Sequence, residues 1–158
     1  GPDLPELPPG KFRIVIISDT HIIGDNYCEG KPPGQADCET PGEDQVSIFE
    51  TEQRLLATRD VINGIEPAPE AVFLLGDAFH DAYESTEVSD YLAATTAPGR
   101  LKSILEGFEM PVHIVWGNHD YEVPAYTREL SHEIFMTVLG QPPYQRIDIK
   151  GWRFLLLN

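Results

Sequence analysis

The chain has 158 residues and a formal charge of −15, from 11 Lys and Arg against 26 Asp and Glu. This length is typical of one domain, and a hydrophobic fraction of 41% is enough to bury a core. The acidity argues against a nucleic-acid binder and against docking on anionic lipid, since both normally need a basic face. Composition leaves open whether the carboxylates only keep the protein soluble or also bind metal cations.

The amino-terminal segment and the two cysteines bear on processing and compartment. Residues 1–10 are polar and Pro-rich, so we expect a linker or tag remnant, with the domain at 11–158. No stretch approaches the ~20 apolar residues of a membrane span. Cys28 and Cys38 either are free thiols or form a local disulfide, and a disulfide would favour an extracytoplasmic location.

Hydrophobic patterning predicts strands that alternate with helices. In chain order, we expect a buried strand at 12–17, a loop at 21–44, a helix at 48–65 ended by Gly64 and Pro67, a strand at 71–75, a helical region at 88–108 interrupted by Pro98-Gly99, a strand at 112–116, a helix at 126–138, and a hairpin of strands at 144–149 and 152–157. The order β-α-β-α-β-α-β-β favours an α/β fold with a mainly parallel sheet. Ligands of such sheets bind beyond the carboxyl ends of the strands.

Metal-binding residue types follow each of the first three predicted strands. The segments are Ser18-Asp19-Thr20-His21, then Gly76-Asp77-Ala78-Phe79-His80-Asp81, and then Gly117-Asn118-His119-Asp120. Because the carboxyl ends of parallel strands share one edge of the sheet, we expect these side chains to converge. Carboxylate and imidazole together suit Zn, Fe or Mn, and the two glycines let the backbone turn sharply beside the site. The sequence therefore predicts a metal centre at this edge.

These three segments, in this order and with helical spacers, resemble the calcineurin-like metallophosphoesterases. The resemblance covers about residues 12–158 and implies a four-layer αββα sandwich fold. It implies metal-dependent hydrolysis of a phosphomonoester or phosphodiester, by attack of a hydroxide that bridges two metal ions (Mn, Zn or Fe). A long loop with cysteines and a nearby Pro-rich segment also resembles the acid sphingomyelinase-like branch.

The resemblance assigns roles to six residues. Asp19 and His21 would bind the first metal ion, Asp77 would bridge both ions, and Asn118 would bind the second. His119 would stabilise charge on the leaving oxygen or protonate it, and Asp120 would orient His119. The expected partner is a small phosphoester substrate, and the lack of a basic run disfavours a nuclease.

The sequence also departs from the family pattern. Family members carry further histidine ligands, including a Gly-His-x-His motif that is missing here, and the chain stops on a strand that lies near the family's midpoint. We therefore expect residues 11–158 to be the amino-terminal portion of such an enzyme, with a second polypeptide segment completing the site. The alternative is a catalytically incompetent fragment that binds metal or partners.

Other residues have ordinary structural explanations. His80 either lines the site or lies outside it, and its position disfavours a ligand role. His113 is expected to be a core or edge histidine within a strand, and His132 to lie on a solvated helix face. Trp116 and Phe79 flank the motifs, and we expect them to pack rather than to bind substrate.

Overall fold

The computed structural model describes residues 4–29, 38, 47–80, 85–121 and 128–158. Its elements in chain order are β1 (Val15–Ile17), the 3-10 helix η1 (Ser47–Glu50), α3 (Thr51–Asn63), β2 (Val72–Leu75), the 3-10 helix η2 (Val88–Leu92), α4 (Ala97–Leu105), β3 (Val112–Val115), α5 (Arg128–Thr137), β4 (Gln145–Ile149) and β5 (Trp152–Leu156). Asp81, Tyr126 and most of the predicted loop at 21–44 lie outside the described residues.

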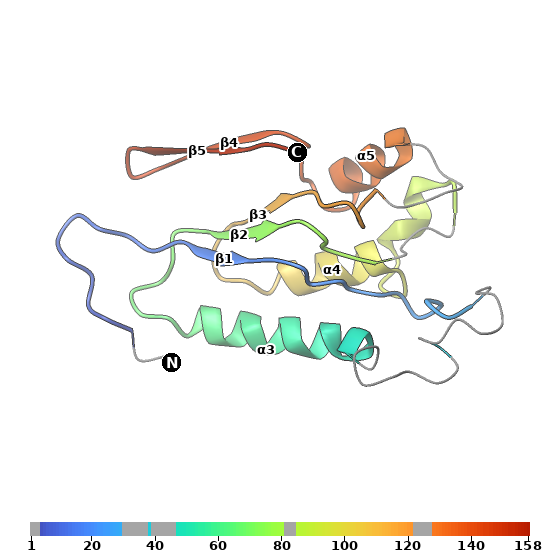
Figure 1. Ribbon diagram of the computed structural model, residues 1–158, viewed down its shortest axis with the longest axis horizontal. Helices are drawn as coiled ribbons and strands as arrows, with labels where there is room; N and C mark the ends of the chain where they lie inside the picture. The colour runs from blue at the N-terminus through green and yellow to red at the C-terminus, as the bar shows by residue number, and fades with distance from the viewer. Residues whose placement is uncertain (1–3, 30–37, 39–46, 81–84, 122–127) are drawn as a thin grey trace.

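The strands form a three-stranded parallel sheet and a separate hairpin (Figure 1). The parallel sheet has the order β1-β2-β3, with Val15 opposite Val72 and Val72 opposite Val112. β4 and β5 pair antiparallel around the turn at Lys150-Gly151, which the sequence predicted. The α/β fold with a parallel sheet is confirmed, because each parallel connection carries a helix across the sheet.

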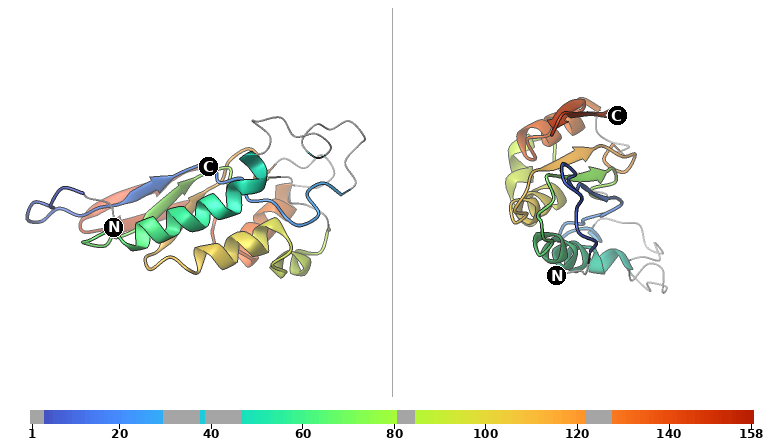
Figure 2. Two further views of the ribbon diagram at one scale, coloured as in Figure 1. Left: turned by 90° about the horizontal axis from the view of Figure 1, so that it is seen from below. Right: turned by 90° about the vertical axis from the view of Figure 1, so that its left-hand side faces the viewer.

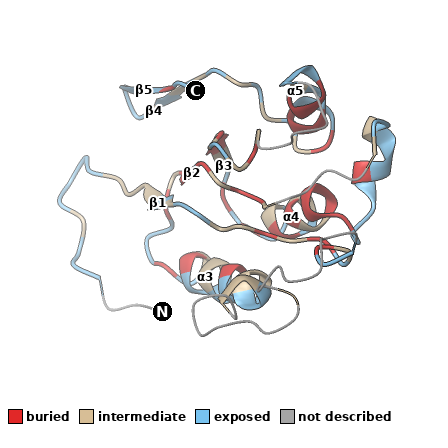
Figure 3. Cartoon of the chain, turned by 45° about the vertical axis from the view of Figure 1, so that its right-hand side comes forward, coloured by how far each residue is buried: buried red, intermediate tan, exposed pale blue. Residues whose placement is uncertain are grey.

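The helices α3, α4 and α5 lie along one side of the parallel sheet (Figure 2). Alternate residues of the strands, such as Val72, Leu74 and Ile114, point into a core that also contains Leu55 of α3 and Leu101 of α4. These side chains are at most 3% exposed, and Figure 3 shows buried residues on the inner faces of the helices. This core fixes the strands that carry the polar segments at their ends.

The opposite face of the sheet is only partly covered. Phe73 packs there against Leu156 and Phe154 of the hairpin, whereas Ile16 and Leu75 are 58% and 46% exposed. The prediction of a buried first strand is therefore wrong. Among the described residues β1 is an edge strand, and the helices cover only the face to which Val15 and Ile17 contribute.

The helix predictions hold except at one break. α3 ends at Asn63, and Gly64 caps it, as the pattern predicted. The Gly64 N–H donates to the carbonyls of Asp60 and Val61 (3.2 Å each). The prediction that Pro98-Gly99 interrupts the second helical region is wrong, because these residues begin α4. Thr96 caps this helix by accepting a hydrogen bond from the Gly99 N–H (3.3 Å), and proline is well tolerated in a first turn. The break between η2 and α4 falls before Thr96.

Most of the other histidines and aromatic residues lie where the sequence predicted. His113 lies within β3, where its Nδ1 is 3.3 Å from Gln145 Oε1 and burial lowers the pKa of its imidazole. Trp116 and Phe79 are 4% and 0% exposed, so they pack in the core. His132 corrects a prediction: its ring contacts that of Trp116 (centroids 4.9 Å apart) rather than lying on a solvated face. α5 packs beside the end of β3, and helical spacing alone cannot show such a neighbour.

Cys28 and Cys38 form a disulfide, which decides between the two alternatives left open by the sequence. No helix within the described part of the chain is long and apolar enough to cross a membrane.

Candidate metal centre

The pairing of β1 with β2 continues beyond both strands. The backbone N–H of Asp19 donates to the Gly76 carbonyl (3.1 Å), and the N–H of His21 donates to the Asp77 carbonyl (2.9 Å). Further along, the His80 N–H donates to the Ile22 carbonyl (3.0 Å). Two polar segments that are more than fifty residues apart in sequence are thereby held side by side at the carboxyl edge of the sheet.

Three residues at this edge have a left-handed backbone. The φ angles of Asp19, His21 and Asp77 are 54°, 42° and 49°, and in the described chain Lys150 of the hairpin turn is the other non-glycine residue with positive φ. This conformation costs an L-residue about 1–2 kcal/mol. Such strain is concentrated at functional sites, where the surrounding structure enforces it. The strained positions are the ones whose side chains form the candidate metal group.

Asp19, His21 and Asp77 can each offer one ligand atom, and these atoms lie within 4.8 Å of one another. His21 Nε2 is 3.9 Å from Asp19 Oδ1. Asp19 is exposed, whereas His21 and Asp77 are half-buried. Two carboxylates and an imidazole are donors that suit divalent transition metals, so the side chains present fit a metal ion.

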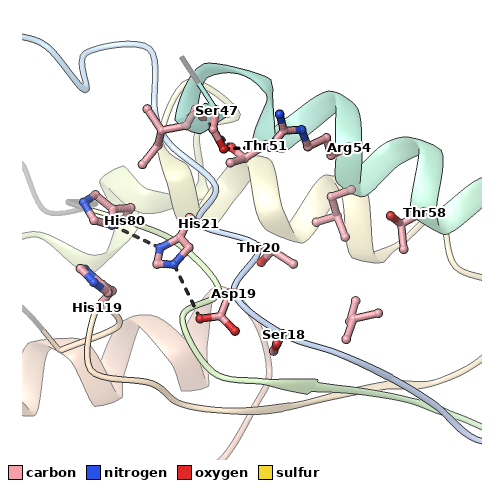
Figure 4. A pocket seen from close by; sticks show the side chains of 13 residues that line it. Ser18, Asp19, Thr20, His21, Ser47, Thr51, Arg54, Thr58, His80 and His119 are labelled. Carbon is pink, nitrogen blue, oxygen red and sulfur yellow. Dashed lines mark hydrogen bonds and ion pairs between the residues drawn. The ribbon is translucent and has the colours of Figure 1, made fainter. Parts of the chain in front are cut away.

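A second group consists of three imidazoles, from His21, His80 and His119, with one nitrogen of each within 4.8 Å of the others. His80 Nδ1 is 3.2 Å from His21 Nδ1 (Figure 4). The His80 ring stacks on that of His119, with centroids 4.3 Å apart and planes at 30°. The sequence left open whether His80 lines the site and disfavoured it as a ligand; the structure places it in the cavity lining and in a group that could hold metal.

Two carboxylates connect the loops after β2 and β3. Asp77 Oδ1 accepts a hydrogen bond from the His119 N–H (3.0 Å). Asp120, which is fully buried, accepts from Ala78 and Phe79 through Oδ1 (2.9 and 3.2 Å) and from Gly117 through Oδ2 (2.7 Å). Each loop therefore holds the other through a carboxylate.

Burial raises the pKa of the Asp120 carboxyl to about 7, although its three backbone donors act to lower it. Through these hydrogen bonds, the Asp120 carboxyl holds the backbones of the two loops together. Orientation of His119 by Asp120, which the resemblance implied, stays a prediction.

The glycines of this edge are required by its close packing. Gly76 has a φ of +80°, which favours a residue without Cβ. A Cβ on Gly117 would lie 2.8 Å from Asp77 Cγ and closer still to Asp77 Oδ1. Asn118, the predicted ligand that follows, is exposed, and its carbonyl accepts the Tyr121 N–H (3.0 Å). The structure thus places Asn118 on the same loop as His119.

The imidazoles open onto a cavity of about 620 Å³. Asp19, His21, His80 and His119 line one part of it, and residues of η1 and α3 line another. Sequence reasoning missed this helical wall. The signal was present, because Ser47, Thr51, Arg54 and Thr58 recur at helical spacing, but without neighbours such a row is indistinguishable from a solvated helix face.

Comparison with known proteins agrees with this geometry. No curated protein matches the chain. The profile of a family described as calcineurin-like phosphoesterase matches residues 12–156, which include every strand and helix of the structure. The chain belongs to the calcineurin-like phosphoesterase family.

Proposed function

We propose that this protein hydrolyses phosphoesters at a dinuclear metal centre built on Asp19, His21, Asp77 and Asn118. The observation that carries the proposal is the convergence of Asp19, His21 and Asp77 at one sheet edge, each held in a left-handed backbone. Family membership supports metal-dependent phosphoester hydrolysis as the reaction class.

The proposed ligand roles follow the family resemblance of the three strand-end segments. Asp19 and His21 would hold the first ion, and Asn118 would contribute to the second. Asp77, whose carboxylate binds the His119 N–H of the neighbouring loop, would be shared by both ions. Metal ions in such a centre neutralise phosphate oxygens and activate a water for attack. Mn, Zn and Fe all suit this mixture of carboxylate and imidazole donors. His80 Nδ1 lies 3.2 Å from His21 Nδ1, which makes His80 a further candidate ligand.

His119 is the proposed acid that protonates the leaving oxygen. Its backbone N–H is bound to Asp77 Oδ1, so the residue is fixed relative to the shared carboxylate, and its ring lines the cavity. Stacking on His80 restricts the orientation of the His119 ring. General acid catalysis requires a group held within hydrogen-bond reach of the leaving atom, and this placement supports that role.

The proposal separates metal binding from proton transfer, so two variants test it. In Mn²⁺-loaded full-length protein, His119→Ala should lower kcat about 10²- to 10⁴-fold while metal content stays unchanged. Asp77→Asn should lose metal as well as activity. His132→Ala is a matched control, because His132 packs on Trp116 outside the cavity.

Hydrolysis of p-nitrophenyl phosphate and of bis(p-nitrophenyl) phosphate, with metal content measured by elemental analysis, gives the readout. Full activity of Asp77→Asn would refute the shared-ligand role. Metal binding without turnover of either ester would support the alternative of a metal-binding fragment without catalytic activity. The two esters also distinguish a monoesterase from a diesterase, and the acid sphingomyelinase-like branch stays a prediction.

We propose an oxidising, extracytoplasmic location, because the Cys28–Cys38 disulfide is of a kind that persists outside reducing compartments. Alkylation of thiols in native extracts, followed by mass mapping of the two cysteines, tests this location.

A further inference from the structure

The cavity beside the candidate metal centre has a second wall, formed by η1 and α3, which contains no candidate metal ligand. Six residues of η1 and α3 line the cavity: the polar residues Ser47, Thr51, Arg54 and Thr58, and the apolar residues Ile48 and Leu55. The polar residues are spaced three or four positions apart, which places them along one face of the helix. Figure 4 shows them on the opposite side of the cavity from His80, His21 and His119.

Arg54 is held in place within this wall. Its Nη1 donates to Ser47 Oγ (2.8 Å) and its Nη2 to Glu50 Oε2 (2.7 Å). A guanidinium has five N–H donors in a planar fork, so donors remain for a ligand after these two bonds. The two bonds favour one orientation of the guanidinium, although the Arg54 side chain is 57% exposed.

Arg54 is the one Lys or Arg among the described residues that line the cavity. The other arginines near α3 point elsewhere. Arg59 pairs with Asp60 (3.0 Å), and Arg100 pairs with Glu52 of α3 (3.4 Å). On a protein with a net charge of −15, Arg54 is therefore the cationic side chain that this wall presents at the cavity, although it is exposed and paired with Glu50.

We infer that the α3 wall is a substrate subsite, in which Arg54 binds a second anionic group of the phosphoester. This inference rests on the proposed function, since it places the scissile phosphate at the Asp19 and His21 end. A planar guanidinium matches the oxygens of a carboxylate or a phosphate. The hydroxyls of Ser47 and Thr58 offer further polar contacts to such a substrate, beside the apolar side chains of Ile48 and Leu55.

The size of the cavity supports a small substrate. Its volume of about 620 Å³ falls within the ~300–1,000 Å³ of sites for small molecules. The substrate class is therefore a small polar phosphoester that carries a second phosphate or carboxylate. Glu50 accepts from Nη2 (2.7 Å), so other N–H groups of the guanidinium remain for the anionic group of a substrate.

Matched pairs of substrates test the subsite. 3-Phosphoglycerate differs from glycerol 3-phosphate by a carboxylate, and fructose 1,6-bisphosphate differs from fructose 6-phosphate by a phosphate. In each pair, one substrate carries a second anionic group. In the Mn²⁺-loaded full-length protein, we expect kcat/KM for this substrate to be at least about tenfold higher in one pair or both, as is typical of a hydrogen bond to a charged group. The pair that discriminates identifies the anion.

Arg54→Gln should reduce this preference to about twofold or less, because glutamine keeps a donor but removes the charge. Arg59→Gln is the matched control on the same helix, and the preference should survive it. The subsite would be refuted if the wild-type protein does not prefer either substrate with two anionic groups over its partner. It would also be refuted if the preference survives Arg54→Gln.

Calorimetric titration with the same compounds separates this inference from the proposed function. If no phosphoester is hydrolysed but 3-phosphoglycerate or fructose 1,6-bisphosphate binds at least tenfold more weakly to Arg54→Gln, the subsite stands and the enzymatic proposal fails. If p-nitrophenyl phosphate is hydrolysed but neither kcat/KM nor Kd depends on Arg54, the enzymatic proposal stands and the subsite fails.

Discussion

Replacement of Gly117 by alanine is expected to displace the central carboxylate of the candidate metal centre. An added Cβ would lie 2.8 Å from Asp77 Cγ, whereas carbon atoms in favourable contact are ~3.5 Å or more apart. Asp77 must therefore shift by at least about 0.7 Å. Its carbonyl is bound to the His21 N–H and its Oδ1 to the His119 N–H, so the shift disturbs both neighbouring loops.

Two magnitudes follow from this displacement. Overpacking of a tight site lowers the free energy of unfolding by about 1–3 kcal/mol. Disturbance of groups that position metal ligands lowers metal affinity by about 10- to 100-fold. We therefore expect Gly117→Ala to weaken Mn²⁺ binding by at least one order of magnitude, with a modest loss of stability.

Calorimetric titration with Mn²⁺ measures the affinity, and urea unfolding in the presence of a chelator measures stability without metal. Gly140→Ala is the matched control. Gly140 has a φ of +64° and open space around an added Cβ, so alanine there costs about 1–2 kcal/mol of backbone strain without touching Asp77. Gly140→Ala should keep wild-type Mn²⁺ affinity. If the Mn²⁺ affinity of Gly117→Ala is within twofold of the wild-type value, the close contact of Gly117 with Asp77 does not determine the geometry of the metal site.

Three further variants test the packing around the site, each by urea unfolding. Asp120→Ala leaves three backbone N–H groups without their acceptor and should lower the free energy of unfolding by about 3 kcal/mol. An unchanged free energy of unfolding would show that the hydrogen bonds of Asp120 do not stabilise the two loops. Phe135→Ala should cost about 3–5 kcal/mol, since Phe135 is fully buried against Trp116 and Phe79, and a loss below 1 kcal/mol would contradict this packing. Cys28→Ser should cost about 2–3 kcal/mol from the loss of a short covalent loop, and chemical reduction of the wild type should have the same effect.

The elements of the fold were largely predictable because they depend on local patterns. Hydrophobic residues at helical spacing predicted α3, including its end at Gly64, and the β-branched run at 112–116 predicted β3. The error at Pro98-Gly99 has a local cause: proline can end a helix or begin one, and the cap at Thr96 decided the outcome. The exposure of Ile16 was not predictable, since burial depends on which elements cover each face of the sheet.

The candidate site was predictable in its residue types and in its location. Polar segments after three parallel strands must meet at one edge, and the structure brings together Asp19, His21, Asp77 and His119 there. The geometry within this edge was not predictable. The place of His80 against His119, and the backbone bonds of Asp120, arise from contacts between loops that are about forty residues apart.

The sequence by itself determined the order of strands and helices, the edge at which the polar segments meet, and the chemistry that those side chains can support. These features follow from periodicity and residue type, which act locally. Only the tertiary structure decided the left-handed backbone at three candidate ligands, the Cys28–Cys38 disulfide, and the wall of α3 that faces the imidazoles. The backbone of the ligands and the α3 wall depend on contacts between segments that are distant in the chain, which the packing of the core fixes. The disulfide joins cysteines only ten residues apart, but residue type alone does not show whether two nearby thiols are paired.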